Sequence, residues 1–509
     1  MRFVPDERWD RRPARAIVDA QLAKLRRFLA EVVLPFSPHY REMFKKLGIE
    51  PKSIRTLDDW ADVPFTSKVD MVPSETNPEG PRRFILQPTP ELIRSEWPKS
   101  KLLGLAARRL FFGEKSVAAA VTREYNPVSI LFTTGRSAAS LPFFLSLYDL
   151  DILGTTGSRI VDVLELAPRR DKVMCLFPYA PHLAFWQVHE CGRSRGILTL
   201  STGGGRVMGG DKIIEILQKV RPTLVSGMPG YFYHVLRKAR ERGVKFDSIE
   251  KVALGGEAVS PELKTRIISI LSDMGARNPR VASVLGFTEA RQCWSECVGA
   301  DDTGFHTSPD LALFEIVDPK TGARLPEGST GELVFTALDG RGSILLRYRT
   351  GDIVEGGITT EVCRGCGRSV PRIATKIRRV SNIKQLDITK VKGTLVNLNT
   401  VGELLAGDKD VEEWQVVIAK ENDDPLDVDV FRLACALRPG TDAGAFRERI
   451  QRDVLALTEV HFNDVEVTGL DDMLTRVGME TNTKEERIVD RRGKTADRKG
   501  GAVHGPSTG

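Results

Sequence analysis

Three cysteines and one histidine occur in two short stretches of the sequence with the spacing of a zinc site. Cys297 and His306 are separated by eight residues, and Cys363 and Cys366 form a C-x-x-C pair. Thiolates and imidazoles are the ligands that Zn²⁺ takes in tetrahedral sites, and nearby glycines let backbone N–H groups point at sulfur. A redox pair and free loop cysteines are the alternatives, although no thioredoxin-like strand and helix surround the pair. Because all four ligands would come from the protein, the zinc would be structural.

A second group of candidates carries oxygen atoms beside glycines. The segment Ser343–Asp352 begins as an apolar run typical of a buried strand and ends in Arg-Thr-Gly-Asp. We expect Asp352 to lie at the end of that strand, next to Gly351, where a carboxylate suits a ribose diol or a phosphate contact. A plain β-turn is the alternative. Thr288 and Glu289 follow another strand-like run, and a hydroxyl beside a carboxylate suits a Mg²⁺–triphosphate complex.

A loop rich in hydroxyl groups follows the strand-like run 128–132. It contains Thr133, Thr134, Gly135 and Arg136. Small residues let backbone N–H groups converge on a phosphate, while the hydroxyls and the cation meet its negative charge. An ordinary hydroxyl-rich turn has the same composition, so both interpretations stay open.

Three further turns follow strand-like runs. The stretch 178–186 combines aromatic side chains with His182, the stretch 227–231 ends in Tyr231, and Gly255, Gly256 and Glu257 stand together. Open α/β sheets bind ligands beyond the carboxyl ends of their strands, which makes all three candidates for a site. His182 is also explained as a buried histidine that satisfies one hydrogen bond, and Tyr231 as a core residue.

The elements that must position these residues have the pattern of an α/β fold. Strands and helices alternate between residues 155 and 260, which favours a sheet with helices on its faces. The strand-like runs are 172–177, 196–200, 222–227, 251–254 and 281–285, with helices expected at 211–220 and 231–242.

The flanking regions differ from this core. Residues 1 to about 75 carry apolar residues at helical spacing, which predicts core-packing helices. From about 80 to 125, several prolines and scattered charges predict a loop-rich excursion with one short helix. After residue 410 the pattern predicts a small α+β domain, with strands near 414–418, 427–431 and 465–467 and a helix near 443–457. The tail from Arg491 is basic and rich in glycine, so we expect it to be disordered.

Bulk composition excludes several classes of protein. With 509 residues and 41% hydrophobic content, the chain can bury a large core in two or more domains. The net charge of +6 arises from 74 basic and 68 acidic residues, so no nucleic-acid partner is expected. The sequence has no run of 18 apolar residues and no signal-peptide pattern at its start, and its seven scattered cysteines fit a reducing compartment. We therefore expect a cytoplasmic protein without a membrane partner.

The order of these motifs along the chain resembles the adenylate-forming (ANL) superfamily, and within it the phenylacetate-CoA ligase-like branch. The resemblance covers roughly residues 35 to 490 and includes Lys484 in a Lys-x-x-Arg-Ile context near the C-terminal end. Two motifs depart from the family pattern. The phosphate loop has one glycine fewer, and the hinge keeps Arg379 without the acidic pair that usually follows.

The resemblance implies both an architecture and site roles. Residues 1–380 would form a large adenylate-forming domain of mixed sheets and helices, with a zinc knuckle near 297–366. Residues 381–490 would form a small mobile α+β lid, and 491–509 a disordered tail. Lys484, Thr288 and Glu289 would be catalytic, with Glu289 holding Mg²⁺. His182, Tyr231 and Gly286 would line the acid pocket. The remaining nucleotide contacts would be Thr133, Thr134, Gly135, Arg136, Gly255, Gly256, Glu257, Gly286, Phe287, Asp352 and Arg379.

The implied function is that of an ATP-dependent, AMP-forming ligase. A carboxylic acid would be activated as an acyl-adenylate with release of pyrophosphate, and coenzyme A is the default acceptor. Aromatic residues at Tyr231, Phe232 and Trp186 suggest an aryl or arylacetic acid. The two departures from the family pattern keep open delivery to an amine, or activation of an oxyanion other than a carboxylate. A non-catalytic nucleotide-binding protein is a second alternative, and a homodimer is possible.

Overall fold

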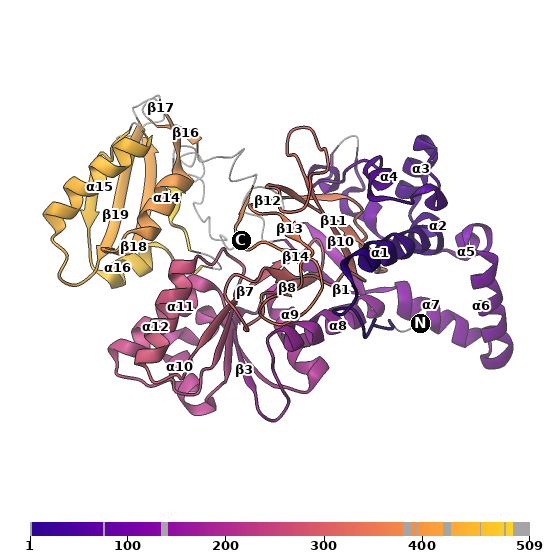
Figure 1. Ribbon diagram of the computed structural model, residues 1–509, viewed down its shortest axis with the longest axis horizontal. Helices are drawn as coiled ribbons and strands as arrows, with labels where there is room; N and C mark the ends of the chain where they lie inside the picture. Colours follow the sequence, from indigo (N-terminus) through magenta and orange to yellow (C-terminus); the bar gives the residue numbers. More distant parts are fainter. Residues whose placement is uncertain are drawn as a thin grey trace, which may run out of the picture. The chain divides into compact units, whose positions relative to one another are not determined.

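The structure is a computed structural model of the chain (Figure 1). It describes residues 3–74, 77–133, 141–379, 388–391, 394–420, 429–458, 460–482 and 485–491. The chain divides into two compact units, Met1–Arg378 and Arg379–Gly509, and each is treated by itself below. The predicted domain boundary near residue 380 and nearly all of the predicted tail fall outside the described residues, and both stay predictions.

The first unit begins with helices that pack on its core. These are α1 (Ala14–Phe28), α2 (Leu34–Phe36), α3 (Pro38–Leu47) and α4 (Leu57–Ala61). In α1 the residues Ile17, Leu22 and Leu25 are buried, as their helical spacing predicts. The helix α4 starts at a capping box between Thr56 and Asp59, which satisfies backbone N–H groups that the helix leaves unpaired.

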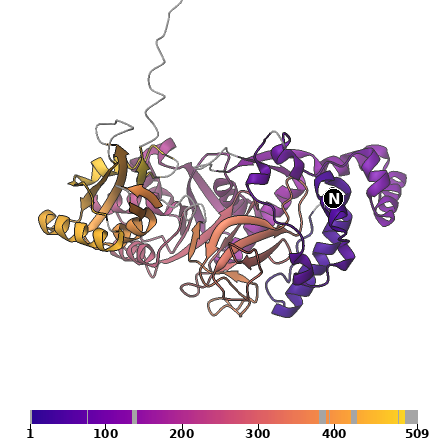
Figure 2. The same ribbon diagram turned by 90° about the horizontal axis from the view of Figure 1, so that it is seen from above.

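Three helices follow in the region from 90 to 125: α5 (Pro90–Glu96), α6 (Lys99–Phe112) and α7 (Glu114–Tyr125). Figures 1 and 2 show α6 at the outer end of the first unit, away from its sheets. The prediction of a loop-rich excursion with one short helix is therefore wrong. Two of the prolines that suggested loops begin helices instead. Pro90 follows the N-cap Thr89, and Pro98 directly precedes α6, positions where a missing N–H costs nothing.

A six-stranded sheet in the order β4-β3-β5-β6-β7-β8 forms the predicted α/β core. Its strands are β3 (Lys172–Pro178), β4 (Leu198–Gly203), β5 (Leu224–Gly227), β6 (Lys251–Gly255), β7 (Arg280–Phe287) and β8 (Gln292–Ser295). The strands β3 to β7 are parallel, and β8 runs antiparallel to β7. The helices are α8 (Leu147–Val163), α9 (Leu183–Arg195), α10 (Gly205–Val220), α11 (Pro229–Glu241) and α12 (Pro261–Asp273). Crossover helices of this kind are what a parallel sheet requires.

A second sheet, in the order β10-β11-β12-β15, carries Asp352. Its strands are β10 (Ala312–Val317), β11 (Gly331–Ala337), β12 (Tyr348–Val354) and β15 (Ile377–Arg379). The apolar run 343–346, which was expected to be the strand before Asp352, lies outside this sheet. The strand starts only at Tyr348, so Asp352 lies within β12 and not beyond its end.

The reason is that the backbone of residues 343–346 bonds to three distant segments. The N–H of Ser343 donates to the carbonyl of Phe144 at 3.1 Å, and that of Ile344 donates to Phe84 at 2.7 Å. The N–H of Leu346 donates to the hydroxyl of Tyr40 at 3.1 Å. These hydrogen bonds take the place of the regular pairing of a β-strand. The local sequence does not predict such distant partners.

Two small sheets complete the first unit. The strands β1 (Pro127–Phe132) and β2 (Pro142–Ser146) pair antiparallel. The strand β14 (Arg372–Ile373) pairs with both β13 (Ile358–Thr359) and β9 (Phe305–His306). The pairing of β14 with β9 joins the stretch that contains His306 to the segment that follows the C-x-x-C pair.

The second unit is a small α+β domain, as the sequence predicts. Its main sheet has the order β20-β19-β18-β21, with β18 (Val411–Lys420), β19 (Asp429–Leu437), β20 (Asp464–Val467) and β21 (Ile488–Asp490). A hairpin of β16 (Ile388–Val391) and β17 (Thr394–Asn397) precedes it. The helices α14 (Leu398–Gly407), α15 (Ala443–Thr458) and α16 (Leu470–Arg476) accompany the sheet, and Phe431, Phe446 and Ile450 lie in its core.

Candidate functional site

The carboxyl ends of adjacent parallel strands bring together the turns singled out in the sequence. His182 lies between β3 and α9, Tyr231 lies in the first turn of α11 after β5, residues 255–257 lie at and beyond the end of β6, and residues 286–289 lie at and beyond the end of β7. In the sheet β3, β5, β6 and β7 are consecutive neighbours. The edge formed by these strand ends is the usual ligand site of an open α/β sheet.

One backbone oxygen connects three of these elements. The carbonyl of Phe132, at the end of β1, lies 2.8 Å from Nδ1 of His182 and 3.4 Å from the hydroxyl oxygen of Thr288. A carbonyl only accepts hydrogen bonds, so Nδ1 of His182 and the hydroxyl of Thr288 both donate to it. The predicted pocket histidine and the predicted phosphate-binding threonine are therefore held at the same point.

The same strand end fixes the base of the hydroxyl-rich loop. The backbone N–H of Thr133 donates to the carbonyl of Leu141 at 3.1 Å, and the N–H of Leu141 donates to the Thr133 hydroxyl at 3.0 Å. Thr133 itself is buried. Thr134, Gly135 and Arg136 lie outside the described residues, so their predicted phosphate contacts stay predictions.

Glycine is required at two of the strand ends because other chain atoms come too close for a side chain. A Cβ on Gly286 would lie 2.3 Å from the sulfur of Cys293, and one on Gly255 would lie 2.8 Å from the carbonyl oxygen of Val284. The next residue, Gly256, has a φ of +85°, which side chains rarely adopt. Gly256 and Gly286 are exposed, so backbone at both ends is open to a flat ligand.

Glu289 receives a hydrogen bond that sequence reasoning missed. The hydroxyl of Tyr348, the first residue of β12, donates to Oε1 of Glu289 at 3.2 Å. Tyr348 is only 2% exposed, whereas Glu289 is half-buried. The two residues are 59 positions apart, and the only sequence signal was that Tyr348 lies in the same short motif as Asp352.

Asp352 is buried in an irregular part of β12. The pairing of β12 with β11 shifts register between Arg349 and Ile353, and Gly351 has a φ of +76°. The N–H of Asp352 donates to the hydroxyl of Thr350 at 3.1 Å. Glu332 of β11 accepts from the Gly351 N–H and pairs with Arg349, which fixes the bulge from its other side.

The described side chains give different support to the other candidates. The ring of Phe287 lies in the main core, 5.5 Å from Trp294 and 5.6 Å from Phe335, so only its backbone can meet a nucleotide. Tyr231 is buried and lies so close to Gly205 that a Cβ there would be 2.5 Å from its hydroxyl. Lys484 and the side chain of Arg379 lie outside the described residues.

Three aromatic side chains, one directly after β3 and two in the first turn of α9, form a cluster. The rings of Tyr179, Phe185 and Trp186 contact one another edge to face at 5.1 Å between neighbours, and the exposed fractions of Tyr179 and Trp186 are 53% and 42%. The hydroxyl of Tyr179 donates to the carbonyl of Ser201 at 2.6 Å, which anchors the ring at the end of β4. Aromatic faces left open in this way can contact a flat apolar ligand.

The predicted metal ligands form one cluster. One ligand atom from each of Cys297, His306, Cys363 and Cys366 lies within 4.8 Å of all the others. The sulfurs of Cys297 and Cys363 are 3.8 Å apart, close to the separation of about 3.8 Å that two thiolates at 2.3 Å from a tetrahedral ion would have. All of these cysteines are free thiols, so no disulfide competes for them.

Hydrogen bonds orient this cluster as metal ligands require. Nδ1 of His306 bonds to the carbonyl of Ser295 at 3.2 Å, which leaves Nε2 facing the sulfur of Cys366 at 3.2 Å. The N–H of Gly365 donates to Cys363. Gly365 must be glycine, because a Cβ there would lie 2.8 Å from the sulfur of Cys297. The donor set and its surroundings therefore fit Zn²⁺.

The protonation states agree with this interpretation. Burial lowers the pKa of His306 to about 4, so the imidazole is neutral, the form that binds metals. A hydrogen bond from Cys366 lowers the pKa of Cys297 to about 4, and the same bond raises the pKa of Cys366.

The N-terminal segment packs directly on this cluster. Trp9 lies in one hydrophobic cluster with Cys297, Cys363 and Val370. The N–H of Ser369 donates to the carbonyl of Asp10 at 3.1 Å, and Arg368 pairs with the Asp10 carboxylate at 3.1 Å.

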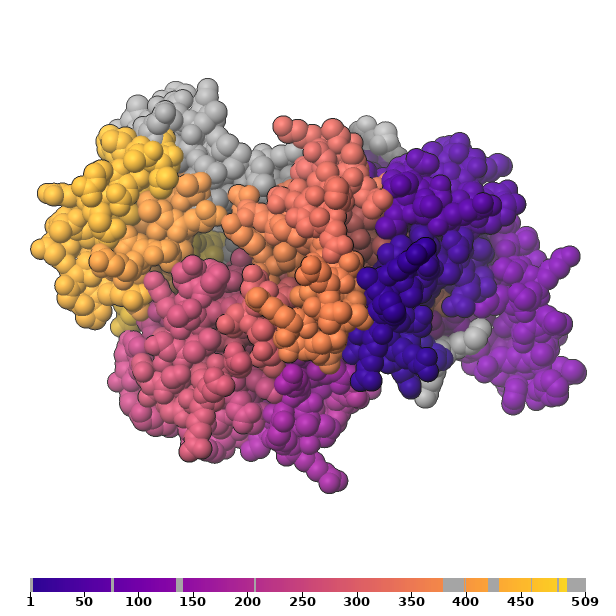
Figure 3. All heavy atoms as spheres, viewed as in Figure 1, coloured from indigo at the N-terminus to yellow at the C-terminus, as the bar shows by residue number. Residues whose placement is uncertain are grey.

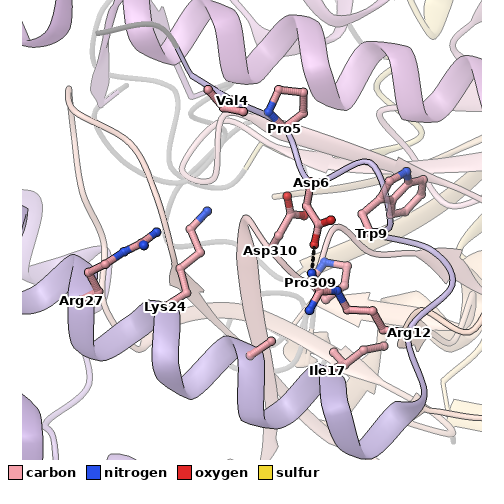
Figure 4. Close-up of a pocket in the computed structure, with 11 residues that line it drawn as sticks. Val4, Pro5, Asp6, Trp9, Arg12, Ile17, Lys24, Arg27, Pro309 and Asp310 are labelled. Atoms are coloured by element: carbon pink, nitrogen blue, oxygen red, sulfur yellow. Dashed lines mark hydrogen bonds and ion pairs between the residues drawn. The ribbon is translucent and has the colours of Figure 1, made fainter.

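A cavity of about 320 Å³ lies beside this segment, between residues 4–12, α1 and Asp310 (Figure 4). It lies apart from the strand ends, and most charges in its lining are already paired. Arg12 binds Asp6 at 2.7 Å, Lys24 binds Asp339 at 3.0 Å, and Asp310 binds Arg159 at 2.6 Å. We assign no ligand to it.

Comparison with known proteins agrees with the fold. The sequence profile of the AMP-binding enzyme family matches residues 153–338. The phenylacetate-coenzyme A ligase of Thermus thermophilus is 25% identical, over 83% of this chain and 82% of that protein. The corresponding ligase of Aromatoleum evansii is 23% identical, over 90% of each chain.

Among solved structures, a 2-hydroxyisobutyryl-CoA ligase in the postadenylation state, in complex with R3-HIB-AMP, has the same fold. Its TM-score is 0.70 at 18% identity, over 96% of this chain and 94% of that one. The chain is therefore similar to AMP-binding enzymes over residues 153–338 and to phenylacetate-coenzyme A ligases over most of its length.

Proposed function

We propose that this chain activates a carboxylic acid with ATP and transfers the acyl group to coenzyme A. In the first step a carboxylate oxygen attacks the α-phosphorus of ATP, the bond from that phosphorus to pyrophosphate breaks, and an acyl-adenylate forms. In the second step the sulfur of coenzyme A attacks the acyl carbon, and AMP leaves. The observation that carries the proposal is the convergence of His182 and Thr288 on one backbone oxygen, beside the glycine-lined ends of β6 and β7.

The residues at the strand ends divide the nucleotide between them. Residues 255–257 offer backbone to the adenine, and Asp352 accepts hydrogen bonds from the ribose. Thr288 follows β7, and its hydroxyl would turn from the carbonyl of Phe132 to donate to a phosphate. Glu289 is the carboxylate for Mg²⁺, held in place by the hydroxyl of Tyr348. Bound Mg²⁺ would neutralise charge on the triphosphate.

The remaining nucleotide and catalytic roles rest on the family resemblance. Thr133 to Arg136 contact phosphates, Arg379 contacts the ribose, and Lys484 meets the carboxylate during adenylation. A mobile lysine suits this task because its point charge can neutralise the attacking and departing oxygens.

The acid is aryl or arylacetic. The phenylacetate-coenzyme A ligases similar to this chain act, by their names, on an arylacetic acid. The open rings of Tyr179 and Trp186 next to His182, with Tyr231 on α11, supply flat apolar surface of the right kind.

The cysteine and histidine cluster holds one structural Zn²⁺. Cys297, His306, Cys363 and Cys366 supply four protein ligands, which leaves no position for a substrate. Bound zinc would cross-link the stretch around β9 to the C-x-x-C loop.

Isotope exchange between pyrophosphate and ATP, measured with a panel of aryl, arylacetic and short hydroxy acids, tests the activation step. We expect exchange with arylacetic acids, and its loss in Asp352→Asn. The matched control is Asp318→Asn, which changes a turn carboxylate that accepts from the N–H groups of Lys320 and Thr321, away from the strand ends. Exchange that persists in Asp352→Asn would contradict the site.

Product analysis tests the acceptor separately. Thioester formation with coenzyme A supports the proposal. Adenylate formation without thioester, combined with amide formation from an added amine, would favour the alternative suggested by the altered phosphate loop and hinge. Absence of exchange with every acid, together with ATP binding, would favour a non-catalytic nucleotide-binding protein.

A further inference from the structure

The helix α6 exposes apolar side chains in a way that folded domains seldom do. None of its residues is buried, and Leu103, Leu110, Phe111 and Phe112 have exposed fractions of 72%, 80%, 75% and 73%. Figure 3 shows this part of the chain as a lobe that projects from the first unit. A cluster of large apolar side chains on a projecting element marks an interaction surface.

Three of these exposed residues, Leu103, Leu110 and Phe111, lie on one face of the helix, whereas Phe112 lies on the opposite side. Successive residues turn by about 100°, so Leu103, Ala107, Leu110 and Phe111 fall within roughly 100° of arc. Leu102 and Leu105 lie on roughly the opposite side and pack against the main core of the unit. The outward apolar face is therefore separate from the side that holds α6 in the fold. We call the face formed by Leu103, Ala106, Ala107, Leu110 and Phe111 the α6 face.

The charges around the α6 face have one dominant sign. Residues 99–115 contain five basic residues, Lys99, Lys101, Arg108, Arg109 and Lys115, and one acidic residue, Glu114. The side chain of Arg108 donates to both the carbonyl and the hydroxyl of Ser116, and these bonds connect α6 to α7. Because Ser116 is neutral, they do not compensate the charge of Arg108. Arg108 borders the apolar arc, where a long side chain can extend beyond an apolar surface. Arg109 lies on the side of Leu102 and Leu105 and pairs with Glu114 at 3.5 Å, and Lys101 pairs with Glu31 at 3.0 Å.

We propose that the α6 face docks on an anionic membrane surface, with its leucine and phenylalanine side chains in the interface and its basic residues on lipid headgroups. An apolar helix face flanked by Lys and Arg is the pattern of interfacial helices. A second copy of the chain is the poorer occupant, because the basic residues around α6 in one copy would face the same basic residues in the other. A single helix about 21 Å long is also short for the area that a stable dimer buries.

Docking of this kind needs no membrane span. Among the helices in the described ranges, none is long and apolar enough to cross a bilayer. The proposal departs from the sequence-based expectation of no membrane partner. That expectation rested on the composition of the whole chain, which does not show a short apolar face on one helix. It is independent of the proposed ligase activity.

Vesicle sedimentation with the full-length chain tests this proposal. The probes are vesicles of phosphatidylcholine alone and of phosphatidylcholine mixed with phosphatidylglycerol. We expect binding to the mixed vesicles, weakened by salt because screening reduces attraction to the headgroups. In the variant Leu103→Gln/Leu110→Gln/Phe111→Gln the new residue, glutamine, is a good helix former, so the helix is kept. Partitioning of this variant onto the mixed vesicles should fall at least about tenfold.

A matched control separates this face from exposed leucine in general. Leu455 and Leu457 of α15 are 46% and 50% exposed, and Leu455→Gln/Leu457→Gln should bind vesicles as the unaltered chain does. Unchanged melting and ATP binding of the α6 variant would show that its fold is intact. Three results would overturn the proposal: no binding to mixed vesicles, equal binding by the α6 variant, or a dimer in sedimentation velocity that the α6 variant abolishes while vesicles are not bound.

Discussion

The hydroxyl of Tyr348 donates to the carboxylate of Glu289 across 3.2 Å and thereby connects β12 to the residues that follow β7, at the proposed magnesium ligand. Removing only this hydroxyl, in Tyr348→Phe, leaves Glu289 without one orienting bond. A hydrogen bond to a charged group is worth about 1.5–3 kcal/mol, so the Mg²⁺ concentration for half-maximal activity should rise about tenfold or more. The measurement is adenylation rate against Mg²⁺ at saturating ATP.

The control for this variant is Tyr40→Phe. Tyr40 is also buried, and its hydroxyl bonds to the backbone of Ile344 and Leu346. We expect Tyr40→Phe to lower the melting temperature without changing the Mg²⁺ requirement. An equal change in Mg²⁺ requirement in both variants would mean that Tyr348 acts through general stability.

Asp352→Ala should weaken ATP binding. A buried carboxylate that accepts two ribose hydroxyls makes charge-assisted hydrogen bonds, each worth about 1.5–3 kcal/mol. We therefore expect a rise in the Kd for ATP of at least about tenfold by calorimetry. An unchanged Kd would remove Asp352 from the site.

Purified protein should contain one zinc per chain, and loss of the metal should release the N-terminal segment. Trp9 packs against the cysteine cluster, and Asp10 is bonded to Arg368 and Ser369. Cys363→Ser, or chelation, should therefore lower the melting temperature and accelerate tryptic cleavage after Arg8 and Arg11. Cleavage after Arg491, in the other unit, provides the reference rate. No stoichiometric metal by elemental analysis would reject the zinc assignment.

Lys484→Ala should separate the two half-reactions. If this lysine meets charge that builds up only during adenylation, its loss lowers that rate about 10²–10³-fold and weakens ATP binding far less. Transfer from a synthetic acyl-adenylate to coenzyme A should be affected less. Equal losses in both half-reactions would contradict a role confined to adenylation, and no loss in either would remove Lys484 from the site.

Stability should decline in mild acid partly through His39. Burial, and then the charge of Arg83, lower the pKa of His39 to about 4 from an ordinary 6.5. Between these values the unfolded chain binds a proton that the folded chain does not, so stability is lost as pH falls through this window. His39→Gln should melt with a shallower dependence on pH between 6.5 and 4 than the unaltered protein.

The sequence predicted the elements whose pattern is local. The parallel strands β3, β5, β6 and β7 are short apolar runs that end in turn residues, so their existence and the positions of their carboxyl ends could be predicted directly. The cluster of Cys297, His306, Cys363 and Cys366 could be predicted because the residue types themselves restrict the chemistry.

Other features depend on partners that are far away in the chain. Leu346 forms a hydrogen bond with Tyr40, and Tyr348 forms one with Glu289. No local sequence pattern predicts either pair. The helices α5 and α6 were missed for a different reason. Proline was interpreted as a breaker, although Pro90 and Pro98 stand at helix starts, where it is compatible with the helix.

The double hydrogen bond between Thr133 and Leu141 has a consequence for the evolution of the predicted phosphate loop. It clamps the two ends of the loop to each other, so the sheet does not depend on what lies between them. Doubling the length of a clamped loop costs only about 0.6 kcal/mol in closure entropy. Residues within the loop can thus be exchanged, lost or inserted at little cost to the scaffold. A chain with one glycine fewer than the family it resembles can accordingly differ in this loop while its architecture is preserved.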